Sequence, residues 1–118
     1  MIIKFNCINI SSQQPEALVK FYNEKLGIPI IDFDTNYDGV TLGFIKDAPV
    51  ICIWDESKWG KSSEGKVNLV FNCDDLEKTY IELKEKGVTL DPPRTADWGG
   101  LELILLDIDD NKLLLLES

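Results

Sequence analysis

The chain carries the same pattern of predicted elements twice, and this internal repeat constrains its fold more than any other feature. In each half, a strand is followed by a helix and three further strands. The glycines that end the two predicted helices, Gly27 and Gly87, are each followed 12 residues later by a second glycine. A copy of about 55 residues is too short to bury a substantial core alone. The repeat therefore predicts two βαβββ modules that share a core.

The first module is expected to span about residues 1–57. Apolar and β-branched residues predict a strand over residues 2–10, and Pro15 suits the first turn of a helix that continues to about Leu26. Gly27 then ends this helix, because glycine adopts left-handed backbone conformations without strain. Three more strands are predicted at residues 29–34, 39–45 and 50–54, with turn-forming residues between them.

The second module is expected to span about residues 66–118, after a polar linker with two glycines at residues 58–65. A strand over residues 67–73 leads to a helix that Asp74 or Asp75 caps. The remaining strands are predicted at residues 88–91, 101–106 and 112–117, with a loop at residues 92–98. The predicted fold class is therefore α+β: a single domain of paired βαβββ modules that forms a curved mixed sheet with a cleft, each module covered by a helix on its outer face.

The charge of the chain excludes two classes of partner. It has 21 acidic residues against 12 basic ones, a formal net charge of -9. Nucleic acids and anionic membrane surfaces bind clustered lysines and arginines, so neither is an expected partner. No apolar run approaches the roughly 20 residues that cross a bilayer. The acidity favours a cationic ligand, although solubility alone explains it as well.

The cysteine and histidine content restricts the chemistry. Cys7, Cys52 and Cys73 are odd in number and far apart, and the strand pattern begins at once without a secretory signal. We therefore expect reduced, buried and inert thiols in a cytoplasmic protein. The chain has no histidine, which excludes a Ser-His-Asp triad and leaves no imidazole to activate a thiol or complete a zinc site.

Strand alternation predicts which side chains face the cleft. In the first strand, Ile8 and Ile10 are expected under the helix, which leaves Cys7 and Asn9 toward the cleft. By equivalence between the repeats, Asn68 at the start of the second module shares that face. Cys7 and Asn68 are therefore candidate ligand-binding residues.

Four further candidates come from the middle of each module and from one loop. Thr41 and Glu102 occupy equivalent strand positions, and a carboxylate in an apolar cleft would have a raised pKa. The favoured alternative places Glu102 on a solvated strand edge. Trp54, Trp59 and Trp98 each either stack on a ligand or cover the rim of the core, and Trp98, in a loop with two glycines, is the best candidate of the three. Arg94 either clamps a carboxylate or forms a surface ion pair.

Three motifs, in matching order and spacing along the chain, resemble those of one superfamily. Residues 21–27 read Phe-Tyr-Asn-Glu-Lys-Leu-Gly, residues 68–75 form the strand that opens the second repeat, and residues 107–111 form a turn rich in aspartate. They are similar to the "FY…LG" signature, the second-repeat strand and the "DPxGN" turn of the vicinal oxygen chelate superfamily. This group contains glyoxalases, bleomycin-resistance proteins and extradiol dioxygenases. The resemblance implies paired βαβββ modules and a homodimer.

Metal-dependent enzymes of that superfamily bind a divalent ion through His, Glu or Gln on several strands. The resemblance carries these positions onto Cys7, Asn68 and Leu114, with the first-repeat equivalent of the last position near Ile53. Such a set lacks the nitrogen and carboxylate ligands that a divalent ion needs. We therefore expect no metal and no other cofactor.

The resemblance favours a small-molecule-binding protein of the bleomycin-resistance type, which would sequester a cationic aromatic compound without a metal. The alternative is a metal-dependent glyoxalase, dioxygenase or thiol transferase of the same superfamily, and a third class is a regulatory domain without a ligand. Besides the resemblance, exposed sheet edges and an apolar final strand, residues 113–116, indicate a homodimer.

Overall fold

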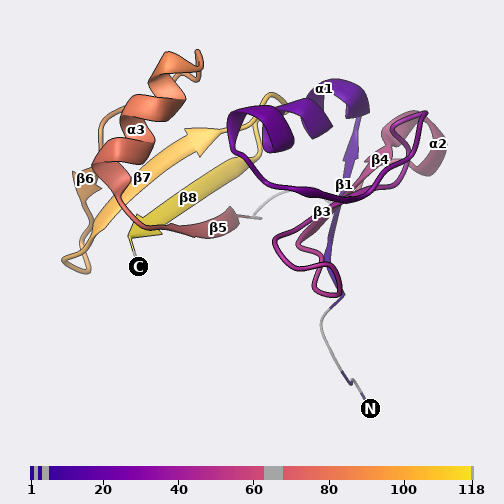
Figure 1. Ribbon diagram of the computed structural model, residues 1–118, viewed down its shortest axis with the longest axis horizontal. Helices are drawn as coiled ribbons and strands as arrows, with labels where there is room; N and C mark the ends of the chain where they lie inside the picture. Colours follow the sequence, from indigo (N-terminus) through magenta and orange to yellow (C-terminus); the bar gives the residue numbers. More distant parts are fainter. Residues whose placement is uncertain (2, 4–5, 63–67, 118) are drawn as a thin grey trace. The chain divides into compact units, whose positions relative to one another are not determined.

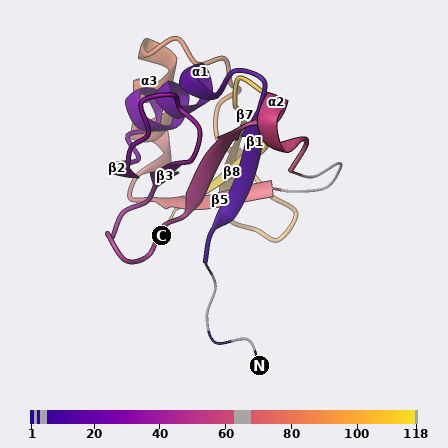
Figure 2. The ribbon, with the colours of Figure 1, turned by 90° about the vertical axis from the view of Figure 1, so that its right-hand side faces the viewer.

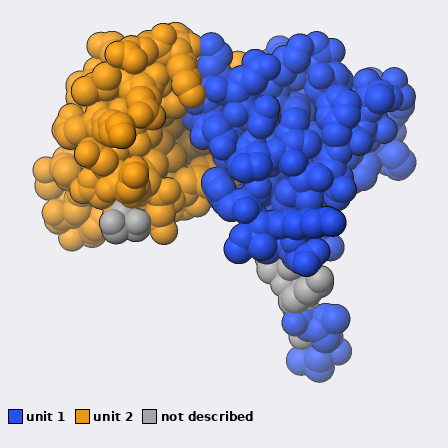
Figure 3. All heavy atoms as spheres, in the orientation of Figure 1, with its two compact units in different colours: residues 1–65 blue, residues 66–118 orange. Residues whose placement is uncertain are grey.

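Each repeat folds into its own four-stranded mixed sheet. Figure 1 shows the computed structural model. The structure describes residues 1, 3, 6–62 and 68–117. It divides into unit 1, residues 1–65, and unit 2, residues 66–118, which Figure 3 distinguishes by colour. No helix among the described residues is long and apolar enough to span a membrane.

The sheet of unit 1 has the strand order β1-β4-β3-β2. Strands β1 and β4 are parallel, and the remaining neighbours are antiparallel. The strands are β1 (Ile8–Ser12), β2 (Ile30–Asp32), β3 (Val40–Leu42) and β4 (Ile51–Asp55). The first strand thus begins later than predicted and extends two residues further, while residues 2 and 4–5 of the prediction lie outside the described part of the chain.

One face of this sheet packs beneath the helical segment. Ile10, Ile53 and Val40 lie in register across three strands and are buried, as are Leu18 and Tyr22 of the helical segment. Each such apolar side chain contributes about 1.5–3 kcal/mol when it leaves water. Strand alternation correctly predicted that Ile10 is buried, while its neighbour on the other face, Asn9, is exposed.

The helical segment runs from Pro15 to Lys25, close to the prediction, but it changes type halfway. Helix α1 (Pro15–Lys20) continues as the π-helix η1 (Phe21–Lys25), and the amide of Leu26 donates to the carbonyl of Phe21 at 3.2 Å. Gly27 follows with φ 73°, the left-handed conformation expected of the helix stop.

Unit 2 repeats the topology, with the strand order β5-β8-β7-β6 and a parallel pair β5–β8. Helix α3 (Leu76–Glu85) begins where Asp75 caps it, because the Asp75 carboxylate accepts the amide of Lys78 at 3.0 Å. Glu117 also accepts the amide of Leu76 at 3.1 Å. The strands are β5 (Asn68–Cys73), β6 (Arg94–Thr95), β7 (Leu101–Leu106) and β8 (Lys112–Glu117).

Two connecting segments contain elements that the sequence did not predict. The predicted linker begins with the last residues of a short helix, α2 (Glu56–Trp59), because Asp55 caps its first turn through the amide of Ser57 at 3.0 Å. Residues 63–65 of the predicted linker lie outside the described residues. The strand predicted at residues 88–91 reduces to one bridge between Leu90 and Leu105. Strand β6 forms instead within the predicted loop, where it pairs with β7.

The apolar final strand does not form an exposed edge. Strand β8 lies between β5 and β7, and its residues Leu113 and Leu115 are buried. The edges of the two sheets are β1 and β2 in unit 1 and β5 and β6 in unit 2. The apolar character of β8 therefore reflects an interior strand, and it gives no support to the predicted homodimer.

Candidate functional site

The sheet face of unit 1 that lies opposite α1, here called the open face, carries amide, hydroxyl and thiol groups. The strand register aligns Asn9, Cys52 and Thr41 in one row across β1, β4 and β3. The hydroxyl of Thr41 donates to Cys52 Sγ at 3.6 Å, and the thiol of Cys7 donates to Asn9 Oδ1 at 3.7 Å. The structure thus brings the predicted candidates Cys7 and Thr41 to the same row of contacts.

Trp54 extends this row and is held from two sides. Its indole Nε1–H donates to Asn9 Oδ1 at 3.1 Å. Behind the ring lies Gly39, where an added Cβ atom would stand 2.9 Å from Trp54 Cζ3. Trp59 of α2 contacts the Trp54 ring edge-on, with ring centroids 5.9 Å apart and an interplanar angle of 75°. In Figure 2, α2 lies near the end of β1.

The two indoles border a cavity of ≈ 360 Å³, here called the indole hollow. Its walls combine two aromatic rings with amide, hydroxyl and ammonium groups, a composition typical of sites for small organic molecules. The lining residues are Asn9, Ser11, Trp54, Trp59, Lys61 and Ser62. From the sequence, Trp54 and Trp59 ranked behind Trp98 as ligand-stacking residues, and Asn9 was expected on the cleft-facing side. The sequence predicted no ligand-binding role for the other lining residues, Ser11, Lys61 and Ser62.

One carboxylate holds Trp59 in place. Asp38 accepts the Trp59 Nε1–H at 2.9 and 3.2 Å through its two oxygens, and it also accepts the amide of Asp55 at 3.0 Å. Lys58 Nζ lies 3.6 Å from the same carboxylate. The hydrogen bond from the Asp55 amide has the largest effect on the pKa of Asp38. Together with Trp59 and Lys58, it holds this pKa below its ordinary value. From the sequence, Asp38 appeared only as a member of a turn.

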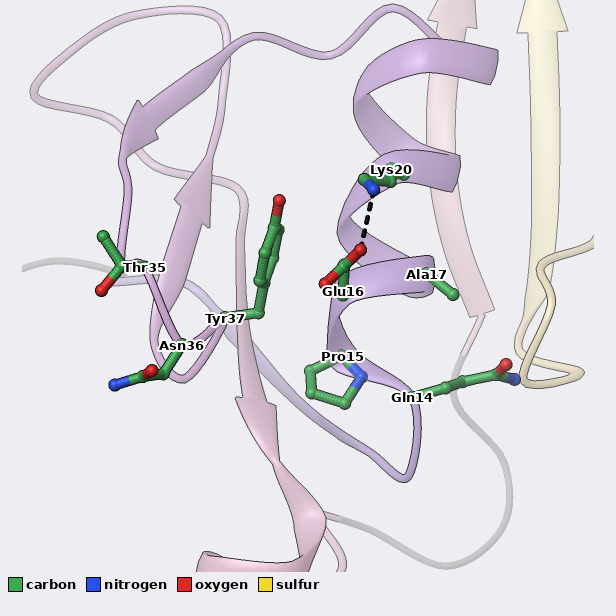
Figure 4. Close-up of a pocket in the computed structure, with 8 residues that line it drawn as sticks. All are labelled: Gln14, Pro15, Glu16, Ala17, Lys20, Thr35, Asn36 and Tyr37. Atoms are coloured by element: carbon green, nitrogen blue, oxygen red, sulfur yellow. Dashed lines mark hydrogen bonds and ion pairs between the residues drawn. The ribbon is translucent and has the colours of Figure 1, made fainter.

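A second hollow, of ≈ 510 Å³, lies between α1 and the turn at residues 35–37. Figure 4 shows the Tyr37 ring between this turn and the side of α1 that carries Glu16 and Lys20. These two side chains form an ion pair at 2.8 Å, and the bond to Glu16 raises the pKa of Lys20. Both side chains are largely exposed to water, which weakens the attraction between them. The indole hollow offers a ligand more aromatic surface.

In unit 2, three of the predicted candidates lie on the β6–β7 hairpin. Arg94 Nε donates to Glu102 Oε1 at 2.9 Å, and Glu102 is only 8% exposed. The favoured interpretation of Glu102 as a solvated edge residue was therefore wrong, because Glu102 is buried and its carboxylate pairs with Arg94 across the hairpin. Trp98 lies in the hairpin turn, 65% exposed, with its ring over Gly100. Asn68 is exposed at the start of β5.

The residues at the superfamily's metal positions do not fit a divalent ion. Leu114 and Ile53 have no donor atoms, and Ile53 is fully buried on the helix side of its sheet. Within residues 6–62 and 68–117, no three His, Cys, Asp or Glu side chains form a group that could hold a metal ion. Burial raises the pKa of Cys7, Cys52 and Cys73, which keeps these thiols protonated and weakens them as ligands and nucleophiles.

A family model matches nearly the whole chain. The family model described as the Glyoxalase/Bleomycin resistance protein/Dioxygenase superfamily matches residues 4–115. Protein YetH of Bacillus subtilis (strain 168) is 27% identical over 126 residues, which cover 99% of this chain and 100% of YetH.

Solved structures show the same fold at low identity. A superfamily member from Sphaerobacter thermophilus has a TM-score of 0.76 and 24% identity, with 100% of this chain and 99% of that chain covered. The antibiotic binding protein TnmS3 from Streptomyces sp. CB03234 has a TM-score of 0.76 and 22% identity, with 100% and 96% covered. Lactoylglutathione lyase from Agrobacterium tumefaciens has a TM-score of 0.79 and 11% identity, with 99% and 95% covered. The predicted fold class is thereby confirmed, and the chain belongs to the Glyoxalase/Bleomycin resistance protein/Dioxygenase superfamily.

Proposed function

We propose that this protein binds an aromatic small molecule in the indole hollow, without a metal, in the manner of a sequestering protein. The observation that carries the proposal is the pair of indoles, Trp54 and Trp59, beside the Asn9 amide on the open face. Aromatic rings supply a large contact area with few rotatable bonds, and a polar group beside them orients the ligand. The likeness to an antibiotic binding protein of the same fold supports binding, whereas the ligand positions speak against a metal-dependent enzyme.

The charge of the protein favours a cationic aromatic ligand. Around the hollow the charges nearly balance, with the acids Asp38, Asp55 and Glu56 against Lys58 and Lys61. Selection for a cation therefore comes mainly from the whole chain, whose net charge of -9 raises the local concentration of cations. A cation over an exposed indole gains about 0.5–1 kcal/mol. Charge thus refines the choice among aromatic ligands, and ring stacking supplies most of the affinity.

The test compares three ligands with one ring system: 1-naphthylmethylamine, 1-naphthalenemethanol and 1-naphthoic acid. Calorimetry should rank their affinities as amine, alcohol and acid, and added salt should narrow the differences because it screens charge. Trp54→Ala should weaken the amine about tenfold, which corresponds to ~1.4 kcal/mol. Trp98→Ala is the control, since Trp98 is an exposed indole that is not among the residues lining the hollow.

Two outcomes would contradict the proposal. If Trp98→Ala weakens binding and Trp54→Ala does not, the site lies with the unit 2 candidates Trp98, Glu102, Arg94 and Asn68. If none of the three naphthalene compounds binds, the hollow is not an aromatic site.

We also propose that the protein is a cytoplasmic homodimer. The described cysteines are all free thiols, which suits a reducing compartment. Each sheet has two edge strands, and an edge strand can pair with a strand of a partner. Sedimentation that gives a concentration-independent species of 13.4 kDa would contradict the dimer.

A further inference from the structure

Trp59 is the less constrained of the two indoles in the hollow. It is 65% exposed and belongs to α2, a helix of four residues that is too short to be stable by itself. Gly60 follows with φ 77°, a left-handed conformation in open surroundings that ends the helix. In contrast, Trp54 belongs to the interior strand β4 and is held between Gly39 and Asn9.

The chain is fastened on both sides of Trp59. Before it, the amide of Asp55 donates to Asp38 at 3.0 Å. After it, Ser62 Oγ accepts the amide of Ser11 at 2.9 Å. A segment of residues 56–61 therefore spans two fixed points, and Asp38 holds its largest side chain through the indole N–H.

The spacing of the indoles decides whether a ring fits between them. Two rings that stack on both faces of a third ring stand about 7 Å apart, twice the optimal carbon–carbon contact of ~3.5 Å. The centroids of Trp54 and Trp59 are 5.9 Å apart and the rings meet edge-on. The present arrangement is therefore too narrow for an inserted ring, and widening requires Trp59 to turn, because Trp54 is fixed.

We propose that Trp59 is a gate of the indole hollow, latched by Asp38, that opens to admit a planar aromatic ring between the two indoles. This inference rests on the proposed function and specifies its ligand class. Opening breaks the hydrogen bond from Trp59 Nε1 to Asp38 and turns the indole to face the ligand, with residues 56–61 as the hinge. The latch lowers the apparent affinity, since only the open fraction binds.

The first experiment follows the two indole N–H signals by NMR in the full chain while the neutral compound 1-naphthalenemethanol is added. A neutral ring separates gating from charge attraction. We expect hydrogen exchange with solvent at Trp59 Nε1 to accelerate on binding, while Trp54 Nε1 stays bonded to Asn9 and protected. Binding that leaves Trp59 exchange unchanged would overturn the gate and leave the proposed function intact. Absence of any binding would overturn the proposed function, and this inference with it.

The second experiment uses two variants that separate the latch from the wall. Trp59→Phe keeps an aromatic wall but removes the N–H that Asp38 holds, so it should bind 1-naphthalenemethanol at least threefold more tightly. Trp59→Ala removes the wall as well and should bind at least threefold more weakly. If both variants bind more weakly, Trp59 is a fixed wall; if both bind more tightly, it is only a cover. Either result would overturn the gate, and far-UV circular dichroism checks that both variants fold.

Discussion

Replacing Gly39 with alanine tests whether the backbone behind Trp54 positions the indole hollow. Gly39 has φ 97°, so a residue with a Cβ atom is strained there by about 1–2 kcal/mol. Alanine also lowers the conformational entropy of the unfolded chain. This effect stabilises the folded variant by up to about 1 kcal/mol and offsets part of the strain. The added Cβ atom would also stand 2.9 Å from Trp54 Cζ3 and 3.2 Å from Cη2, so the ring must move.

A displaced Trp54 ring loses its hydrogen bond to Asn9, which is worth about 0.5–1.5 kcal/mol. We therefore expect Gly39→Ala to lower the free energy of unfolding by about 2 kcal/mol, measured by urea denaturation. It should also change the near-ultraviolet circular dichroism of the indoles and weaken naphthalene binding.

Gly27→Ala is the matched control for this substitution. Gly27 has a similar left-handed conformation, φ 73°, in the same unit, but nothing lies within 4 Å of an added Cβ atom. Gly27→Ala should lower the free energy of unfolding by only about 1 kcal/mol, the part due to backbone strain. It should leave the near-ultraviolet spectrum of the indoles unchanged. If the two variants are equally destabilised and Gly39→Ala leaves the spectrum and binding intact, our account of how Trp54 is held is wrong.

Three further predictions concern polar contacts outside the hollow wall. Arg94→Ala should lower the free energy of unfolding by about 1 kcal/mol, because it removes a largely exposed partner of the buried Glu102 carboxylate. In a double-mutant cycle with Glu102→Ala, measured by urea denaturation, the two losses should not add, and strict additivity would argue against the pair. Asp75→Ala should lower the free energy of unfolding by about 1 kcal/mol, because the N-terminal cap of α3 is lost. An equal loss for Asp74→Ala would show that the cap is misassigned. Because the pKa of Asp38 is lowered in the folded protein, its stabilising contribution is present above the unfolded value of about 3.9 and disappears as pH falls through the folded pKa. Asp38→Asn should therefore flatten the acid unfolding profile below about pH 4, and a profile that matches the parent protein would exclude this role.

Local features of the structure followed from the sequence because they depend on residues near one another. The helix stop at Gly27, the capping of α3 by one of two adjacent aspartates, and the burial of Ile10 beside an exposed Asn9 each reflect a period or a turn within a few residues. The repeat of these local signals predicted the fold class, which family membership confirms.

Contacts between distant residues required the tertiary structure. The bond from Trp54 to Asn9 joins residues 45 apart, and the bond from Trp59 to Asp38 joins residues 21 apart. Neither follows from a sequence pattern, since each depends on which strands pair and in which register. The sequence alone determined that the chain has two βαβββ repeats and lacks metal-ligand side chains at the positions that the superfamily uses. Only the pairing of β1 with β4 and β3, and the position of α2 beside them, decided that an amide and two indoles form the hollow.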